Sequence, residues 1–343
     1  MRKKPLSLIA FAILLAMLSV SLIQTATSQD AAKFEYTQAN YASKDFDASV
    51  CSFVDKFEGD KLDLTKWGFQ NGDGSQYGIA GWGNNERQAY ATENVTVQDG
   101  TLRITAKAER KYGKDFTSGK IVTANSRGEG SIGEPADGRG TKFAQTYGRF
   151  EAKIRFSKTA RGLWPAFWMM PDYGTYGGWP RSGEIDIMEI AGYEPNKASS
   201  AMHVKPPGDG WQSKFLGASH TFEEGKTYAD WHVYGLVWTP EEIIFLIDGL
   251  ETRRIERSQW NTPWYAANGF DKPGAPFDHK MHLALNLALD SGQWKQGNSL
   301  QGGAELPVTM EVEWVRAYTM EKDPWPKSFG KLPDDRKNDF GSN

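Results

Sequence analysis

The chain has 343 residues, 39% of them hydrophobic and 24% charged, with 40 Lys and Arg against 43 Asp and Glu and a formal net charge of −3. This composition predicts a folded chain of one large domain or two modest ones, and its interspersed charges exclude the basic surface of a nucleic-acid-binding protein. The 13 Trp, 13 Tyr and 18 Phe residues suit a carbohydrate surface, because sugar rings stack on aromatic rings, although most Trp are expected in the core.

The first 28 residues predict a secretory signal peptide. The basic start "MRKK" precedes the apolar run "LSLIAFAILLAMLSVSLI", and Ala26-Thr27-Ser28 supplies the small residues that a signal peptidase recognises. We therefore expect cleavage before Gln29 and a secreted or periplasmic protein without a membrane attachment. An uncleaved anchor is the alternative, since the apolar run is close to the shortest length that spans a bilayer.

Residues 51–320 consist largely of short segments in which apolar and polar residues alternate, the pattern of strands with one buried face. The clearest are "TLRITAKA" (101–108), "RFEAKIRF" (149–156), "EEIIFLIDGLETRRIE" (241–256), which turns at Asp248-Gly249, and "VTMEVEWVRAY" (308–318). In the last segment, Val308, Met310, Val312 and Trp314 are expected on one face.

These strands predict an all-β fold, a sandwich or jelly roll that forms a single domain. Residues 29–50 are polar and aperiodic and predict an N-terminal spacer. The Gly-rich stretch 124–142 is expected at the rim of the cleft, and residues 321–343 predict a charged C-terminal tail.

The stretch "RSGEIDIMEIAG" (181–192) places three carboxylates on one predicted strand. Because side chains alternate, Glu184 and Asp186 share a face, and Glu189 joins them only if a β-bulge at Ile187-Met188 absorbs one residue. Glu184 and Glu189 would then lie about 13 Å apart at Cα, and side chains leaning together would leave about 5–6 Å between the carboxyl groups. Retaining glycosidases use that separation, with one acid as nucleophile and the other as general acid and base. Asp186, between them, would push their pKa values apart.

An exposed acidic face or a calcium site is the alternative interpretation of three carboxylates. They follow "GLWPAFWMMPDYGTYGGWP" (162–180), in which Trp164 and Trp168 are in strand phase. Acids beside aligned aromatic rings are typical of a sugar-binding cleft.

These two motifs resemble glycoside hydrolase family 16, in the branch with the bulged E-x-D-x-x-E motif, and the laminarinases (endo-β-1,3-glucanases) in particular. The resemblance implies a jelly-roll β-sandwich of two curved antiparallel sheets with a substrate cleft on the concave face. It covers most of residues 50–320, and further segments follow the order of the family. They are "WGNNERQAYATENVTVQDGTLRITA", "FTSGKIVT", "YGRFEAKIRF", "WHVYGLVWTPEEIIFLIDG" and "HLALNLAL".

The resemblance implies that Glu184 is the nucleophile, that Glu189 is the general acid and then the general base, and that Asp186 holds and tunes the nucleophile. It also implies a set of substrate contacts. Asn84 and Arg87 match positions that hydrogen-bond the sugar on the non-reducing side, Trp164, Trp168 and Trp179 match the aromatic lining, and His203 matches a cleft histidine beside the acid/base. For His203, a hydrogen-bonded core histidine is the alternative.

We expect no cofactor and no catalytic metal, since His279 and His282 lack other ligands nearby. Many members of the family carry a structural calcium bound by two acids, at positions where this chain has Lys56 and Glu313. A Lys56–Glu313 ion pair can replace the metal, and calcium stays open as the alternative. The segment "DSGQWKQG" (290–297) also departs from the family pattern and leaves the fine specificity open.

The predicted function is that of a secreted, monomeric endo-β-1,3-glucanase acting on β-glucan, with mixed 1,3-1,4 linkages as a further substrate. An algal galactan hydrolase of the agarose type and a cell-wall transglycosylase share the motif and remain alternatives. A non-catalytic β-glucan recognition protein is the third alternative, but such relatives typically lack the catalytic acids that Glu184 and Glu189 supply here.

Overall fold

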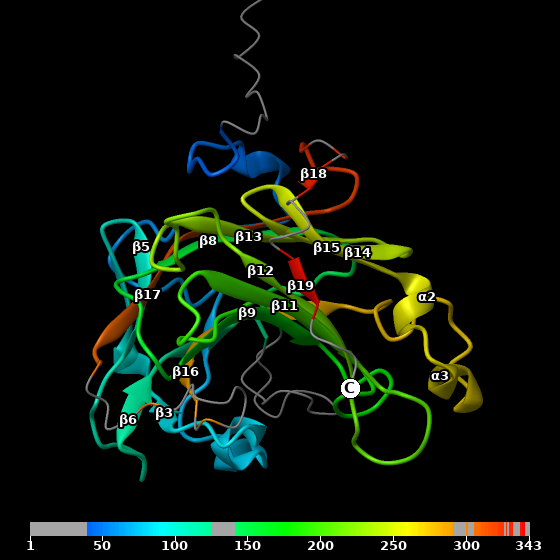
Figure 1. Cartoon of the computed structure of the whole chain (residues 1–343), viewed down its shortest axis with the longest axis horizontal. Helices are drawn as coiled ribbons and strands as arrows, with labels where there is room; N and C mark the ends of the chain where they lie inside the picture. The colour runs from blue at the N-terminus through cyan, green and yellow to red at the C-terminus, as the bar shows by residue number, and fades with distance from the viewer. Residues whose placement is uncertain are drawn as a thin grey trace, which may run out of the picture. The chain divides into compact units, whose positions relative to one another are not determined.

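Two large β-sheets packed face to face account for most of the chain that the computed structural model describes (Figure 1). The structure describes residues 40–124, 141–290, 292, 300, 305–325, 327, 329–331 and 337–339. These residues belong to one compact unit that spans residues 37–343. The predictions for residues 1–28, for most of the loop 124–142 and for most of the segment 290–297 lie outside the described residues.

The first sheet has nine strands within the described ranges. Their order is β18 (Gly330–Lys331), β15 (Leu250–Glu256), β14 (Glu242–Ile247), β13 (His232–Trp238), β8 (Gly148–Phe156), β17 (Val308–Tyr318), β5 (Thr101–Ala106) and β4 (Val95–Gln98), with β1 (Phe53–Asp55) also paired to β17. All pairs are antiparallel except β15 with β18.

The second sheet has eight described strands, all of them antiparallel to their neighbours. Their order is β19 (Lys337–Asp339), β12 (Lys214–Thr221), β11 (Lys197–Val204), β10 (Glu184–Glu189), β9 (Leu163–Pro171), β16 (Met281–Leu289), β7 (Lys120–Val122) and β2 (Gly68–Phe69).

Short elements lie between these strands. They are the small parallel pair β3 (Gln88–Tyr90) and β6 (Phe116–Ser118), the 3-10 helices η2 (Ala48–Val50), η3 (Ser75–Tyr77), η4 (Ala80–Gly83) and η5 (Thr92–Asn94), and the α-helices α2 (Arg257–Trp260) and α3 (Pro263–Ala267). None of the described helices is long and apolar enough to cross a membrane.

The core lies between the two large sheets and confirms the predicted β-sandwich. In β8, Phe150, Ala152, Ile154 and Phe156 are buried on the core side, as their alternation predicts. The predicted hairpin also forms, because Asp248 and Gly249 both adopt positive φ angles, of 51° and 76°, which a two-residue turn between twisted strands requires.

The predicted phase of β17 is wrong after Val312. The register shifts between Val312 and Trp314, so that Glu313 is an extra residue in the strand. Val315 and Ala317 consequently face the core, whereas Trp314 packs against Phe46 with ring centroids 5.7 Å apart.

Residues from the predicted spacer and tail pack on the outer face of the first sheet. The packed structure therefore extends beyond residues 51 and 320 on both sides. Tyr41, Phe46 and Trp325 are buried, and the Tyr41 and Trp325 rings meet edge to face at 4.9 Å. They cover Glu151, which accepts hydrogen bonds from Tyr41, Arg149 and Arg316. A buried carboxylate requires hydrogen-bond partners, and this requirement explains why the N-terminal and C-terminal segments pack on the sheet over Glu151.

Candidate active site

A cavity on the outer face of the second sheet contains the three predicted carboxylates. It is lined by Trp82, Asn84, Glu86, Lys120, Trp164, Ala166, Trp168, Glu184, Asp186, Glu189, Asn286 and Ala288. The side chains come from β10 and from the neighbouring strands β9, β16 and β7, together with the segment that contains η4. The cavity therefore brings together segments that lie about 200 residues apart in the sequence.

A β-bulge in β10 places the third carboxylate on the same face as the first two. Asp186 pairs with Trp168 and Met188 pairs with Phe167, so Ile187 is the extra residue, as the spacing predicts. Both Ile187 and Met188 are buried in the core. The Ile187 carbonyl accepts a hydrogen bond from the Ser200 hydroxyl at 3.0 Å, which satisfies a polar group that the bulge removes from regular pairing.

Indole N–H groups hold the two glutamates. Trp164 on β9 donates from Nε1 to Oε1 of Glu189 at 2.7 Å, and Trp179 donates from Nε1 to Oε2 of Glu184. An indole can only donate, so each bond fixes a carboxylate oxygen as the acceptor. Trp164 and Trp179 therefore orient the predicted acids as well as contributing rings.

His203 lies beside Asp186 on β11. Its Nε2 is 3.4 Å from Oδ2 of Asp186, and its Nδ1 is 2.8 Å from the hydroxyl of Ser213. Burial lowers the pKa of His203, an effect that the charge of Glu189 opposes only in part. A neutral imidazole carries a single N–H; a proton on Nε2 would face the carboxylate of Asp186 and leave Nδ1 to accept from Ser213.

One end of the cavity contains a chain of hydrogen bonds in which only Trp168 is a predicted site residue. Trp168 donates to Oδ1 of Asn286 at 2.7 Å, Asn286 donates to the Tyr90 hydroxyl at 3.1 Å, and Tyr90 donates to Glu86 at 2.8 Å. Beside this chain, the ammonium group of Lys120 lies 4.4 Å from the ring centroid of Trp82 and 4.7 Å from that of Trp168.

The two predicted sugar ligands near η4 lie in different places. Asn84 is exposed and lines the cavity. Arg87 is not among the lining residues: its guanidinium group donates to the Leu300 carbonyl and lies 4.8 Å from the ring centroid of Phe116. Direct contact of Arg87 with a sugar therefore stays a prediction that this geometry does not support.

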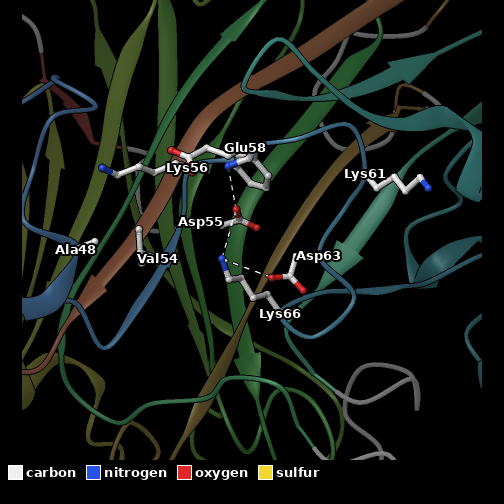
Figure 2. A pocket seen from close by; sticks show the side chains of 9 residues that line it. Ala48, Val54, Asp55, Lys56, Glu58, Lys61, Asp63 and Lys66 are labelled. Atoms are coloured by element: carbon white, nitrogen blue, oxygen red, sulfur yellow. Dashed lines mark hydrogen bonds and ion pairs between the residues drawn. The ribbon is translucent and has the colours of Figure 1, made fainter.

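The predicted Lys56–Glu313 ion pair, which would replace calcium, does not form. Glu313 lies 2.7 Å from Lys153, whereas the Lys56 ammonium group is 4.4 Å from the ring centroid of Phe46. Nearby acids are also paired, since Lys66 lies 3.7 Å from both Asp55 and Asp63 in the pocket beside β1 (Figure 2). A divalent cation would have to displace these ammonium groups, so the residues present do not fit a calcium ion.

The predicted absence of a catalytic metal concerns His279 and His282. His279 lies 3.0 Å from the Ser182 carbonyl through Nε2, and burial together with the charge of Lys120 lowers the pKa of His282 to about 3. Within the described ranges, no three His, Cys, Asp or Glu side chains are arranged to hold a metal ion.

Comparisons with known proteins point to one family. Residues 83–316 match the family model described as Glycosyl hydrolases family 16. The glucan endo-1,3-beta-glucosidase A1 of Niallia circulans is 35% identical over 77% of this chain and 37% of its own length, and the beta-glucanase of Rhodothermus marinus is 35% identical over 75% of this chain and 80% of its own. This chain thus spans little more than a third of the Niallia relative.

A similar arrangement of strands occurs in a solved structure. The laminarinase catalytic domain from Thermotoga maritima superposes with a TM-score of 0.63 and 28% sequence identity, over 78% of this chain and 97% of that chain. The two-sheet architecture described above is therefore shared with that domain.

Proposed function

The chain belongs to glycosyl hydrolases family 16, and from this membership we propose that it is an endo-acting β-1,3-glucanase that cleaves β-glucan with retention of configuration. One observation carries the proposal: the bulge in β10 brings Glu184 and Glu189 to the same cavity, where an indole N–H holds each of them. The names of the Niallia and Thermotoga relatives support β-1,3-glucan as the substrate.

In the proposed reaction, Glu184 attacks the anomeric carbon while Glu189 gives its proton to the departing glycosidic oxygen. The C–O bond to the leaving sugar breaks as the ester bond to Glu184 forms. Glu189, now a carboxylate, takes a proton from water, which attacks the same carbon and releases Glu184. Two inversions give net retention.

Asp186 and His203 position the nucleophile in this proposal. Asp186 lies between the two glutamates along β10, and its Oδ2 lies 3.4 Å from Nε2 of His203. Ser213 contacts the other imidazole nitrogen, which fixes the ring of His203 beside Asp186. A fixed negative charge at Asp186 also favours the proton on a neighbouring carboxyl group.

A reducing-sugar assay of residues 29–343 on laminarin, mixed-linkage glucan and agarose tests this proposal. We expect activity on laminarin that Glu184→Gln abolishes and that Glu58→Gln, at an exposed acid outside the cavity, retains. Activity on mixed-linkage glucan would widen the linkage range. Activity on agarose alone would show that the substrate is a galactan and not β-glucan. Binding of laminarin without turnover by the wild-type protein would favour a recognition protein.

We also propose that the protein is exported as a monomer and needs no cofactor. The basic and apolar start of the chain supports export. N-terminal sequencing of the secreted protein should begin at Gln29, and an intact N-terminus in the membrane fraction would contradict this. Activity and melting temperature should not change in excess EDTA. A rise in melting temperature with calcium would contradict the proposal that no cofactor is needed.

A further inference from the structure

The turn that precedes β10, residues 176–183, carries Trp179, whose indole N–H donates to Oε2 of Glu184. Trp179 is 38% exposed, so packing of its own ring does not fix its direction. A group that supports a reaction must stay within roughly 0.5 Å of its productive position, and a group on a loop needs neighbouring residues to hold it there. The residues that anchor this turn therefore determine how well Trp179 meets Glu184.

Hydrogen bonds within the turn give it a defined shape. The Arg181 N–H donates to the Gly178 carbonyl at 3.0 Å. The Ser182 hydroxyl accepts from the Tyr176 N–H at 3.0 Å and donates to the Gly177 carbonyl at 2.6 Å. These bonds join residues of the turn to one another, so its position relative to the sheet depends on contacts with other segments.

Tyr265 on α3 ties the turn to β11. Its hydroxyl donates to the Arg181 carbonyl at 2.9 Å and accepts from the N–H of Lys205, the residue after β11, at 3.4 Å. Thr262, just before α3, donates to the Lys205 carbonyl at 2.6 Å. Tyr265 is fully buried, and β11 is the strand that pairs with β10. One buried hydroxyl therefore links the turn before β10 to the neighbouring strand.

The Arg181 side chain makes a second attachment to the same segment. Its guanidinium carbon is 5.4 Å from the ring centroid of Trp264 on α3 and 5.3 Å from that of Trp211, in the loop before β12. Its Nε is buried and makes no hydrogen bond to a residue that the structure describes, so contacts with the rings hold the group. Both the backbone and the side chain of Arg181, two residues after Trp179, are thus anchored on α3.

We propose that Tyr265 and Arg181 are positioning residues, which hold the turn so that the Trp179 N–H meets the nucleophile Glu184. The inference rests on the proposed glucanase function. A hydrogen bond donated to a carboxylate favours its ionised form, and only the ionised form attacks the sugar. Tyr265 is buried and neither residue lines the cavity, so both act on Glu184 through Trp179.

Tyr265→Phe removes the hydroxyl and retains the ring. We expect kcat on laminarihexaose to fall about tenfold, equal to about 1.4 kcal/mol, with KM within about twofold, because the donor shifts while the cavity lining stays. Arg181→Met should act in the same direction. Hydrolysis of 4-nitrophenyl β-laminaribioside should fall to the same extent, since the nucleophile attacks both substrates. A loss confined to laminarihexaose would show that these residues serve sugar binding, and would overturn the inference.

Thr252→Val is the matched control for the loss of a buried hydroxyl. Thr252 is 1% exposed and donates to the Phe245 carbonyl at 3.0 Å in the first sheet, away from the cavity. This variant should melt earlier than the wild type, as Tyr265→Phe should, but retain kcat on both substrates. An equal fall of kcat in Thr252→Val would mean that general destabilisation explains the result for Tyr265→Phe.

A double-mutant cycle with Trp179→Phe tests the route of the effect. Trp179→Phe retains a ring and removes the N–H, so Tyr265→Phe should lower kcat no further in that background. Independent, multiplying losses would overturn the inference, and so would unchanged kcat in both Tyr265→Phe and Arg181→Met. If Tyr265→Phe does not fold, the same cycle with Arg181→Met decides. Failure of the proposed function looks different: the wild-type protein would then cleave neither substrate.

Discussion

At the scale of single residues, indole donors do more than stack on sugars. Trp164→Phe retains an aromatic ring but removes the N–H that Glu189 accepts at 2.7 Å. This hydrogen bond contributes about 0.5–1.5 kcal/mol while Glu189 is a carboxylic acid and about 1.5–3 kcal/mol once it is a carboxylate, so we expect kcat to fall about tenfold with little change in melting temperature. Trp168→Phe, whose N–H binds Asn286, is the control for ring substitution. Equal kcat values for Trp164→Phe and the wild type would show that the donor is dispensable.

His203 provides a test of protonation at the site. Its pKa is lowered by burial, so the imidazole should be neutral at pH 6.5 and become charged only at lower pH. An NMR titration of the ring, assigned by comparison with His203→Asn, should give a midpoint below 6.5. A midpoint above 6.5 would mean that an imidazolium is ion-paired with Asp186.

At the scale of secondary-structure elements, two bulges differ in how well the sequence predicts them. The sequence reveals the bulge at Ile187, because three clustered carboxylates are expected on one face of the strand and Glu189 is one residue out of step with the other two. The bulge at Glu313 is not visible, because Trp314 is apolar and fits the core or the outer face equally well. The alternation of side chains cannot tell the core face of a strand from its outer face when other residues cover both faces.

The hydrogen bond from Ser200 to the Ile187 carbonyl supports the catalytic bulge. Ser200→Ala removes the donor and leaves a buried carbonyl with one partner fewer, which should cost about 1–3 kcal/mol of unfolding free energy in urea. Because the bulge directs Glu189, kcat should also fall while KM changes little. A normal kcat in a destabilised variant would show that the bulge holds its shape without this bond.

At the scale of the whole molecule, the terminal segments complete the first sheet. The alternation of residues along one segment could not predict these contacts. Tyr41 is hydrogen-bonded to Glu151, 110 residues away in the sequence, and to Arg316, 275 residues away. The strands, the hairpin and the acids follow from alternation, turn chemistry and spacing. Lys120 was missed for a related reason, because a single lysine in a strand suggests a solvent-exposed face and only the fold surrounds it with rings.

Glu151 makes the stability of the molecule depend on pH. Burial raises its pKa, but Arg316 and Arg149 outweigh burial, and the net effect is a lowered pKa. Its contribution to stability is thus full above the unfolded-state pKa of about 4.3 and is lost as the pH falls through the lower folded-state value. Glu151→Gln should cost about 3–5 kcal/mol at pH 7, because it leaves Arg316 without its partner.

Urea unfolding of the wild type and of Glu151→Gln between pH 3 and 7 checks this prediction. The gap in unfolding free energy between the two proteins should be constant near neutral pH and narrow as the pH falls below about 4.3. A gap that does not change with pH would contradict the ionised state of Glu151.

In the proposed mechanism, Glu184 forms a covalent bond to the sugar and Glu189 does not. The most direct measurement is to inactivate the protein with a 2-deoxy-2-fluoro β-laminaribiosyl fluoride, which slows release of the intermediate, and to locate the sugar by peptide mass spectrometry. We predict one added sugar on the peptide that contains residues 181–192, with fragmentation placing it on Glu184. A sugar on Glu189, or inactivation without any covalent adduct in a protein that hydrolyses laminarin, would contradict these roles of Glu184 and Glu189.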